Sequence, residues 1–584
     1  MMELGTEKNT REPRVVLHDS LTGDWLEFSV PLAIYTTATL RDVVPLLQEM
    51  EARVECEQLY AAGFIAYEAA PAFDPALPVR ADAEFPLMWF GLFSSVQVVP
   101  APVPTARVAD TLHWRPESSH AEYDAALREI RDAIQSGETY QVNYSYRLRT
   151  HLQGDSWALF CELAGKVPFA AYVQTGSLSM CSFSPELFFK REGARFESRP
   201  MKGTRPRGVT VDADLAQRDA LVSSEKERAE NVMIVDMVRN DFGRIARPCS
   251  VQVPRLFTPE KYPTVWQLTS TVQALSDVST VAALQALFPP ASITGAPKRR
   301  TMQLIRELEQ SPRRVYTGTI GYLAPGQRAH FNVAIRTVLI QEEQGIAEYG
   351  IGSGIVWDSR ANDEYAETLA KARALQRYPQ DFALLETLLW TPQEGYWLES
   401  LHLRRLAQSA NYFDIPLDLS AVQDALQRVV VSATTRIRVR MTVSQTGAIQ
   451  VTTHDAPAAN YGRICLAKTA IDRHTVFLYH KTTHRDMYQR LLAECPGADD
   501  VILLNDAGEV TESTRANIAI QRNGVFYTPP VSCGLLAGTL REALIQEGRF
   551  VERIISLDEL VKSDAIYLVN SVRGMHPVML SHHD

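Results

Sequence analysis

The sequence predicts a mixed α+β protein made of two large domains, and three observations support this fold class. The chain has 584 residues, which exceeds the roughly 100–200 residues of one ordinary domain. Strand-like runs at residues 63–67, 178–190 and 331–341 alternate with helix-like runs at residues 123–134 and 298–309. A helical stretch from about Asp363 ends near the Tyr378-Pro379 step, after which residues 382–389 begin a new strand-like segment. We therefore expect one domain over residues 1–380 and a second over residues 381–584.

The composition indicates a globular protein and argues against several other classes of protein. Hydrophobic residues make up 46% of the chain, which is enough to bury large cores, and the net charge of −10 argues against nucleic-acid binding. The seven cysteines are scattered without a C-x-x-C pair, as is typical of a reducing compartment. The N-terminal segment is polar, and no apolar run approaches the ~18–20 residues of a membrane span. We expect a soluble, cytoplasmic protein that does not contact a membrane.

Two pairs of glutamates indicate a site for a cation. Glu227 and Glu230 lie three residues apart in a helix-like stretch at residues 225–237, and Glu364 and Glu367 repeat this spacing in another. Residues three apart project from one helix face, so each pair presents two carboxylates together. Carboxylates without nearby His or Cys suit a hard cation such as Mg²⁺. On spacing alone, the alternative that both pairs are solvated surface charges stays open.

Other segments have the features of an anion-binding site. Residues 292–298 (SITGAPK) form a predicted loop that enters a helix with a proline near its first turn, so free backbone N–H groups there can bind a carboxylate. Arg336, within the strand-like run, can add a bidentate contact, and the glycines of residues 350–354 (GIGSG) allow close backbone approach. A lone arginine on a strand is also typical of a structural ion pair.

Taken together, these residues resemble the chorismate-utilising enzymes, a family that includes anthranilate, isochorismate, salicylate and aminodeoxychorismate synthases. The likeness runs over residues 122–377 and includes the segments 137–143 (GETYQVN), 184–186 (SPE), 200–204 (PMKGT), 230–241, 294–298 (TGAPK) and 364–372. It implies an antiparallel β-sandwich core with helices, and chorismate as substrate. It further implies that Mg²⁺ is held directly or through water by Glu227, Glu230, Glu364 and Glu367. Substrate binding is implied for Thr204, Thr294, Gly295, Ala296, Lys298, Arg336, Gly352, Ser353 and Gly354.

Lys202 distinguishes among members of this family. Members that resemble aminodeoxychorismate synthase carry Lys in this P-x-K-G-T motif, where anthranilate synthases usually carry Ala. A lysine whose pKa is lowered by burial can be a nucleophile, so the resemblance implies attack on C2 of chorismate as the C4 hydroxyl leaves, followed by ammonia at C4. Glu186 is the matching candidate acid for the departing hydroxyl. Gln267 stands where many relatives carry a histidine, and we exclude it from catalysis because an amide cannot transfer protons.

The nitrogen source is predicted to lie outside this sequence. We find no Gly-x-Cys-x-Gly nucleophile motif followed by a His-x-Glu pair, so the sequence contains no recognisable glutaminase. We expect ammonia to come from a separate glutamine amidotransferase subunit or from solution.

A second group of motifs follows residue 380. Arg405 lies in a helix-like segment, Lys481 in residues 480–483 (HKTT) and Glu512 in residues 510–514 (VTEST). Pyridoxal phosphate requires a lysine for its aldehyde, a carboxylate that keeps its pyridine nitrogen protonated, and N–H groups at a helix start for its phosphate. The segments 534–541 (GLLAGTLR) and 570–574 (NSVRG) are suited to the last role.

This ordered group resembles the fold-type IV pyridoxal-phosphate enzymes, which include branched-chain aminotransferase, D-amino-acid aminotransferase and aminodeoxychorismate lyase. The resemblance covers nearly all of residues 382–584 and implies an α/β domain that binds pyridoxal 5′-phosphate and allows a homodimer through this domain. The implied cofactor contacts are Lys481 at the aldehyde, Glu512 at the pyridine nitrogen, and Arg405, Thr539 and Leu540 at the phosphate, the last two by their backbone. Asn570 and Ser571 are implied nearby.

The fusion itself favours one function for the second domain. Its motifs separate a lyase from an aminotransferase poorly, but a lyase that acts on aminodeoxychorismate would take the first domain's product and release pyruvate. We therefore predict synthesis of 4-aminobenzoate, a folate precursor, in two steps. One alternative is an anthranilate- or isochorismate-type synthase fused to a branched-chain or D-amino-acid aminotransferase, against which Lys202 argues. Another is a sensor or scaffold without activity, but all of the reactive residues are present.

Overall fold

The computed structural model describes residues 12–20, 22–104, 108, 112–165, 167–372, 382–457 and 463–581. The chain divides into two compact units, the first made of Met1–Pro206 with Arg218–Tyr378 and the second of Arg207–Gln217 with Pro379–Asp584. The short segment Arg207–Gln217 thus groups with the second unit, and the single division expected at residue 380 stays a prediction. The predicted helix end near Tyr378 lies outside the described residues.

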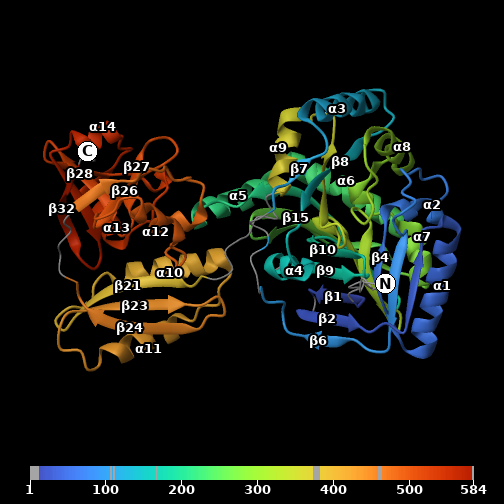
Figure 1. Cartoon of the computed structure of the whole chain (residues 1–584), viewed down its shortest axis with the longest axis horizontal. Coiled ribbons are helices and arrows are strands. Elements are labelled where there is room, and N and C mark those ends of the chain that lie inside the picture. The colour runs from blue at the N-terminus through green and yellow to red at the C-terminus, as the bar shows by residue number, and fades with distance from the viewer. Residues whose placement is uncertain are drawn as a thin grey trace, which may run out of the picture. The chain divides into compact units, whose positions relative to one another are not determined.

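The first unit contains two large β-sheets whose strand pairings are antiparallel (Figure 1). In spatial order, the first sheet consists of β16 (Gly295–Ala296), β8 (Gln141–His151), β20 (Ile346–Ile355), β19 (Thr337–Gln341), β10 (Leu178–Ser184), β9 (Phe169–Gln174), β1 (Arg14–Asp19), β2 (Asp24–Ser29) and β6 (Gln97–Val99), with β7 (Arg115–Pro116) beside β8. The second sheet consists of β13 (Met201–Pro206), β15 (Val265–Leu275), β12 (Arg195–Arg199), β11 (Leu187–Glu192), β18 (Arg328–Val333), β17 (Thr319–Ala324), β4 (Tyr60–Ile65), β5 (Met88–Phe93) and β3 (Ala33–Thr37), with β14 (Gln252–Lys261) beside β15.

The two sheets pack face to face. Val15 and Val173 from the first sheet and Phe64 and Trp89 from the second belong to one buried apolar cluster. Burial of such side chains stabilises the fold by about 1.5–3 kcal/mol each, so this shared core holds the sheets together. The predicted antiparallel β-sandwich is confirmed.

Helices cover the outer faces of the sandwich. Helices α3, α4 and α8 contribute to the cluster on the first sheet, and α1, α6 and α7 contribute to the cluster on the second. The helices before residue 373 are α1 (Leu40–Glu57), α2 (Ala70–Phe73), α3 (His120–Gln135), α4 (Ser156–Ala164), α5 (Val211–Ser223), α6 (Glu225–Gly243), α7 (Thr280–Leu287), α8 (Lys298–Leu308) and α9 (Ala361–Ala372).

The helix predictions are confirmed, and two strand predictions need correction. Helix α3 begins at a capping box in which Ser119 and Glu122 satisfy each other's backbone N–H groups. The strand-like run 178–190 is two strands, β10 and β11, which lie in different sheets. The run 331–341 is also two strands, because the backbone breaks at Arg336, whose φ is 50°. Apolar runs show where strands lie but not where the chain passes from one sheet to the other.

The second unit contains a four-stranded antiparallel sheet and an eight-stranded mixed sheet, in which β25 pairs in parallel with β26 and β32. The smaller sheet consists of β22 (Gly395–Tyr396), β21 (Leu384–Thr391), β23 (Ile437–Val443) and β24 (Ile449–Asp455). The larger consists of β27 (Val510–Ser513), β26 (Asp500–Leu504), β25 (Arg463–Leu466), β32 (Gly574–Leu580), β31 (Ala565–Asn570), β28 (Asn517–Arg522), β29 (Val525–Thr528) and β30 (Phe550–Glu552). The helices are α10 (Glu399–Phe413), α11 (Leu419–Val430), α12 (Asp486–Ala493), α13 (Thr539–Gln546) and α14 (Leu557–Val561).

In the part of the chain that the structure describes, no helix combines the length and the apolar character that crossing a membrane requires.

Candidate active sites

The first unit contains a cavity of about 190 Å³ where β13, β20, α6 and α9 meet. Most of the residues that the sequence analysis assigned to this domain line it. They are Glu186, Lys202, Thr204, Glu227, Glu230, Arg336, Gly352, Ser353, Gly354, Glu364 and Glu367.

Lys202 extends from β13 toward the glutamates. Its Nζ lies 3.2 Å from Oε2 of Glu230. Burial would lower the pKa of Lys202, but Glu230 and Glu367 outweigh burial and raise it, which differs from the expected lowering. Gly354 makes room for the side chain, because a Cβ at this position would lie only 2.8 Å from that Nζ. The absence of a side chain at Gly354 therefore permits the close approach of Lys202.

The four glutamates share the cavity with lysines. Lys226 lies 3.9 Å from Glu230, and Lys371 lies 2.8 Å from Glu367. Burial raises the pKa of Glu227, and repulsion from the neighbouring Glu230 carboxylate raises it further. The donors are carboxylate oxygens, which Mg²⁺ accepts together with water. The residues present therefore fit this ion in chemical type.

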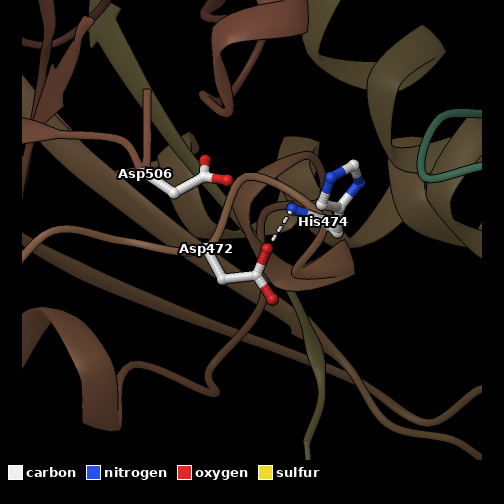
Figure 2. Close-up of side chains that lie close together, drawn as sticks. All are labelled: Asp472, His474 and Asp506. Atoms are coloured by element: carbon white, nitrogen blue, oxygen red, sulfur yellow. Dashed lines mark hydrogen bonds between the residues drawn. The ribbon is translucent and has the colours of Figure 1, made fainter. Parts of the chain in front are cut away.

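The second unit contains another group of three side chains that could bind a metal ion. Among the described residues, only Asp472, His474 and Asp506 have ligand atoms within 4.8 Å of one another, and all three are exposed (Figure 2). Asp472 accepts a 2.8 Å hydrogen bond from the backbone N–H of His474, which closes a local turn. Asp506 lies 3.6 Å from Arg473. These contacts give the group a structural role in its loop.

Glu186 is a buried carboxyl group in the cavity wall. The Ser292 hydroxyl donates a 2.7 Å hydrogen bond to its Oε1. Burial raises the pKa of Glu186 to about 7, although Ser292 and Lys202 both favour the charged form. A carboxyl group with this pKa can hold a proton near neutral pH and donate it. Ser292 was part of the predicted loop, but its contact with Glu186 follows only from the fold.

Arg336 and Thr204 lie at the same cavity. Arg336 forms no ion pair with a carboxylate among the residues that the structure covers, and burial lowers its pKa. A guanidinium in this position is suited to a substrate carboxylate. Thr204 accepts a 3.4 Å hydrogen bond from Gln267, so the glutamine that replaces the usual histidine contacts a cavity residue.

The turn after Ile293 does not reach the cavity. Gly295 and Ala296 pair with β8, and Thr294 donates to the backbone before it. Lys298 is held by Asp241 at 3.2 Å and by two backbone carbonyls. The polar groups of these residues hold the loop in place, and the substrate-binding role expected of Thr294, Gly295, Ala296 and Lys298 stays a prediction.

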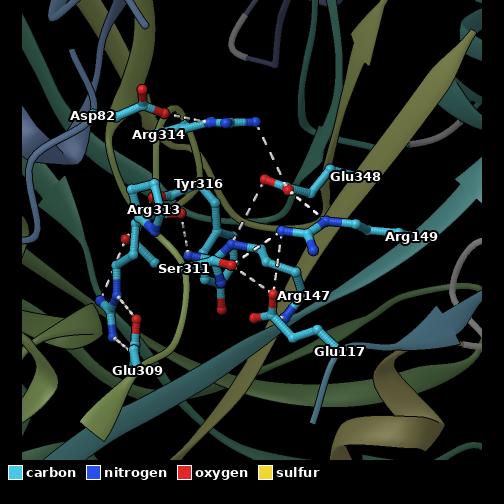
Figure 3. Close-up of polar contacts among 12 residues, drawn as sticks. Asp82, Glu117, Arg147, Arg149, Glu309, Ser311, Arg313, Arg314, Tyr316 and Glu348 are labelled. Atoms are coloured by element: carbon cyan, nitrogen blue, oxygen red, sulfur yellow. Dashed lines mark hydrogen bonds and ion pairs between the residues drawn. The ribbon is translucent and has the colours of Figure 1, made fainter. Parts of the chain in front are cut away.

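A buried arginine fixes the segments that carry this cavity. Arg313 forms a 2.6 Å ion pair with Glu309 inside a polar network (Figure 3). It also donates to the carbonyls of Asn143 at 2.7 Å and Ile293 at 2.9 Å, two residues of the cavity wall. Loss of one partner from a buried ion pair costs about 3–5 kcal/mol. Sequence reasoning missed Arg313 because, apart from Glu309, these partners come from other segments of the chain.

The second unit contains a cavity of about 280 Å³. Of the residues predicted to contact the cofactor, those that line it are Arg405, Lys481, Glu512, Thr539, Asn570 and Ser571. Leu540 does not line it, since its side chain packs in the core with Ala519 and Leu544. The contact predicted for Leu540 is one of its backbone, and its N–H lies in the first turn of α13.

Lys481 is anchored by its backbone and has a depressed pKa. Its carbonyl accepts a 2.9 Å hydrogen bond from the N–H of Leu385 in β21. Burial lowers the pKa of Lys481 to about 8, and the nearby Arg405 lowers it further. The adjacent His480 stacks against Tyr412 at 4.4 Å and bonds to the Val209 carbonyl at 3.2 Å within the second unit. An amine held in this way can reach its neutral, nucleophilic form near physiological pH.

Glu512 provides a carboxylate on the cavity wall. It accepts a 2.7 Å hydrogen bond from the Tyr488 hydroxyl and a 3.2 Å bond from the N–H of Leu536. Burial raises the pKa of Glu512 to about 7. A carboxyl group that is buried and fixed by two donors fits the position opposite a pyridine nitrogen.

Two residues that sequence reasoning missed hold the predicted phosphate contacts. Glu386 is buried and accepts hydrogen bonds from Arg405 at 2.6 Å and His402 at 2.7 Å. The other ring nitrogen of His402 lies 3.2 Å from the Thr539 hydroxyl. Burial would raise the pKa of Glu386, but Arg405 and His402 outweigh it and lower the pKa to about 2. These contacts link Arg405 through Glu386 and His402 to Thr539, so they fix the positions of the Arg405 and Thr539 side chains relative to each other.

The residue before α13 is a glycine, which lets the start of this helix lie close to neighbouring groups. Gly538 precedes the helix, and a Cβ there would lie 1.9 Å from Oδ1 of Asn517. The N–H groups of the first turn have no partner within the helix, so they can bind an anion. Asn570 instead uses its side-chain oxygen for the N–H groups of Val572 and Arg573, which stabilises the adjacent turn. The residues present thus fit pyridoxal phosphate in donor type, burial and charge.

Comparison with known proteins gives a separate family match for each part of the chain. A family model described as chorismate binding enzyme matches residues 22–377, and one described as amino-transferase class IV matches residues 383–580. Aminodeoxychorismate synthase component 1 of Klebsiella aerogenes is 38% identical over 54% of this chain and 76% of its own length. The protein of the same name from Salmonella typhimurium is 41% identical over 45% of this chain and 59% of its own length. Aminodeoxychorismate synthase of Streptomyces griseus is 42% identical over 48% of this chain and 39% of its own length. The chain thus spans less than two thirds of the last two relatives.

Among solved structures, anthranilate synthase component I of Streptococcus pneumoniae TIGR4 is similar in fold. It has a TM-score of 0.50 and 24% identity, and the match covers 65% of this chain and 94% of that one. This likeness supports the sandwich architecture of the first unit.

Proposed function

We propose the following for this chain, which belongs to the family of chorismate-binding enzymes and also carries a class IV aminotransferase domain. The first domain converts chorismate and ammonia to 4-amino-4-deoxychorismate and water. The second domain converts this product to 4-aminobenzoate and pyruvate. The observation that carries the proposal is the position of Lys202, an amine in the same cavity as Glu186 and the four glutamates.

The first step is a substitution at the chorismate ring. Nζ of Lys202, in its neutral form, forms a bond to C2, both ring double bonds shift, and the C4 hydroxyl leaves with a proton from Glu186 as water. Ammonia then attacks C4, and both double bonds shift back as the bond from C2 to the lysine amine breaks. Arg336 binds a substrate carboxylate during both substitutions.

Magnesium is expected to be held by Glu227, Glu230, Glu364 and Glu367, directly or through water. When bound, the ion neutralises substrate charge and stabilises negative charge that develops in the transition state. The residues Lys226 and Lys371 balance the charge of this group.

Nitrogen is expected from a partner protein. The relatives from Klebsiella aerogenes and Salmonella typhimurium are each component 1 of a synthase, which supports a separate glutamine amidotransferase that supplies ammonia. Free ammonium at high concentration serves the same step.

The second step is an elimination. Arg405, Thr539 and the first turn of α13 would hold the phosphate of pyridoxal phosphate, with Lys481 at its aldehyde and Glu512 at its pyridine nitrogen. When bound, this cofactor supplies an electron sink for a carbanion next to the substrate amine. Nζ of Lys481 removes the proton from C4 of the substrate, the enolpyruvyl oxygen leaves, and the ring becomes aromatic.

The pH dependence of the first step should depend on Glu186. Because Glu186 acts as an acid and its pKa is about 7, the rate of amination should fall as the pH rises above this value. Glu186→Gln should lower the rate by about 10²–10⁴-fold and remove this limb of the pH profile. Ser292→Ala should instead move the limb to higher pH, because the hydroxyl favours the charged form of Glu186. An unchanged limb in Glu186→Gln would assign the acid to another residue.

Identification of the product tests the whole proposal. The purified chain should convert chorismate, in the presence of ammonium, Mg²⁺ and pyridoxal phosphate, to 4-aminobenzoate and pyruvate in equal amounts. Chelation of the metal should stop chorismate consumption but leave conversion of supplied aminodeoxychorismate intact, and Glu230→Gln or Glu367→Gln should do the same. Anthranilate as the main product, or amino transfer to a keto acid without pyruvate release, would overturn it.

A further inference from the structure

The ring of His480, the residue before Lys481, is held by hydrogen bonds at both of its nitrogens. Its Nε2 lies 3.2 Å from the Val209 carbonyl oxygen, and its Nδ1 lies 3.0 Å from the Ser409 hydroxyl. A carbonyl oxygen only accepts, so Nε2 carries the proton and Nδ1 accepts from Ser409. Burial lowers the pKa of His480 to about 4, so the ring is neutral at physiological pH and keeps this arrangement.

Val209 belongs to a short segment that comes from the first half of the sequence but groups with the second unit. Its side chain packs against a buried cluster that includes Tyr479. Arg207, at the start of the segment, donates to the Tyr412 carbonyl at 3.1 Å, and its guanidinium carbon lies 4.3 Å from the centre of the Tyr412 ring. The centre of the His480 ring lies 4.4 Å from the centre of the same tyrosine ring. The segment and His480 therefore share one set of buried contacts.

A closed turn holds the Val209 carbonyl in place. Asp214 accepts a 2.6 Å hydrogen bond from Arg207 and a 3.1 Å bond from the N–H of Gly208. Both side chains of the Arg207–Asp214 ion pair are buried, with 6% of each exposed. The turn requires Gly208, since a Cβ there would lie 2.3 Å from the carbonyl carbon of Ala213. The carbonyl that the histidine ring contacts therefore belongs to a fixed turn.

Ser409 connects the same ring to the helix that carries a proposed phosphate contact. Ser409 and Arg405 are four residues apart on α10, so their side chains lie on the same helix face. On the other side, His480 and Lys481 share a peptide bond, and the Lys481 carbonyl is bound by the N–H of Leu385. The ring of His480 thus links residues 207–217 to the backbone from which the Lys481 side chain extends.

We propose that His480 is a positioning residue for Lys481, and that the segment Arg207–Gln217 is part of the second active site because its Val209 carbonyl holds the His480 ring. This inference rests on the proposed function, which assigns Lys481 to the cofactor. Loss of the contact with Val209 would let the Lys481 amine move toward water and away from Arg405. Both changes raise the pKa of Lys481, because burial and Arg405 are what lower it.

Two substitutions of His480 separate its contact with the segment from its contact with Ser409. In His480→Gln the amide nitrogen takes the place of Nε2 and can still donate to the Val209 carbonyl, whereas the shorter side chain of His480→Asn does not reach it. In the cofactor-free full chain, labelling of Lys481 by trinitrobenzenesulfonate, followed by peptide mass spectrometry, should reach half its maximal rate near pH 8. His480→Asn should move this midpoint upward by about one pH unit, and His480→Gln should leave it in place.

The affinity for pyridoxal phosphate, titrated by absorbance, gives a second measurement. His480→Asn should weaken binding by about 10-fold, the usual effect of losing one hydrogen bond, while His480→Gln stays close to the wild type. Arg207→Gln should also weaken binding, because it opens the turn that holds Val209. Arg218→Gln is the matched control, since Arg218 follows the segment and pairs with the exposed Asp219. Unchanged consumption of chorismate by each variant shows that the chain is folded.

The outcomes separate this inference from the proposed function. If borohydride fixes the cofactor on Lys481 in the wild type, but His480→Asn matches His480→Gln in both measurements, this inference alone is overturned. If the cofactor becomes fixed on another lysine or does not bind, the proposed function of the second domain fails and the inference with it.

Discussion

Replacement of Lys481 by alanine is expected to stop the second reaction and leave the first intact. The variant should consume chorismate at the wild-type rate but accumulate aminodeoxychorismate, because the amine that moves the C4 proton is lost. The rate of pyruvate release should fall by at least about 10²–10⁴-fold. The measurement is simultaneous chromatography of chorismate, the amino intermediate and 4-aminobenzoate.

The same variant should lose the spectroscopic signature of the cofactor. In the wild type, borohydride should remove the visible band and fix the cofactor on Lys481, as peptide mass spectrometry can show. Lys562→Ala is a control, because Lys562 is exposed and pairs with Asp558 on the surface. Labelling of a different lysine, or full 4-aminobenzoate production by Lys481→Ala, would refute the role assigned to Lys481.

Replacement of Lys202 by alanine is expected to have the opposite effect. Loss of the nucleophile should lower formation of aminodeoxychorismate by at least about 10³-fold. Chorismate should persist or convert slowly to an anthranilate- or isochorismate-like product, because ammonia or water can attack C2 directly. Supplied aminodeoxychorismate should still be converted at the wild-type rate, and this second activity shows that the variant is folded.

A mixture of the two variants tests how the steps are linked. If the intermediate diffuses between molecules, Lys202→Ala and Lys481→Ala together should restore 4-aminobenzoate formation. Wild-type amination by Lys202→Ala alone would show that the first step does not need a lysine nucleophile.

The chemical type of each site could be predicted from the sequence. The spacing of Glu227 and Glu230 places both carboxylates on one helix face wherever that helix lies, because side-chain direction in a helix is local. Lys202, Lys481 and Glu512 stand in ordered motifs, so their roles could be inferred by resemblance. The sandwich and the second, cofactor-type domain were implied by the family resemblance that the motifs carry, whereas apolar periodicity indicated only a mixture of helices and strands.

Tertiary structure decided which groups meet. The contacts of Ser292 with Glu186 and of Glu386 with Arg405 join residues 106 and 19 positions apart, and no local pattern reports such distances. The loop at Gly295 shows the converse, since its sequence suits an anion but its N–H and carbonyl groups pair with β8. The sequence by itself determined the reactive side chains, the helix faces and the order of the domains. Folding determined their pKa values and their partners, because burial and long-range proximity arise only when distant segments pack together.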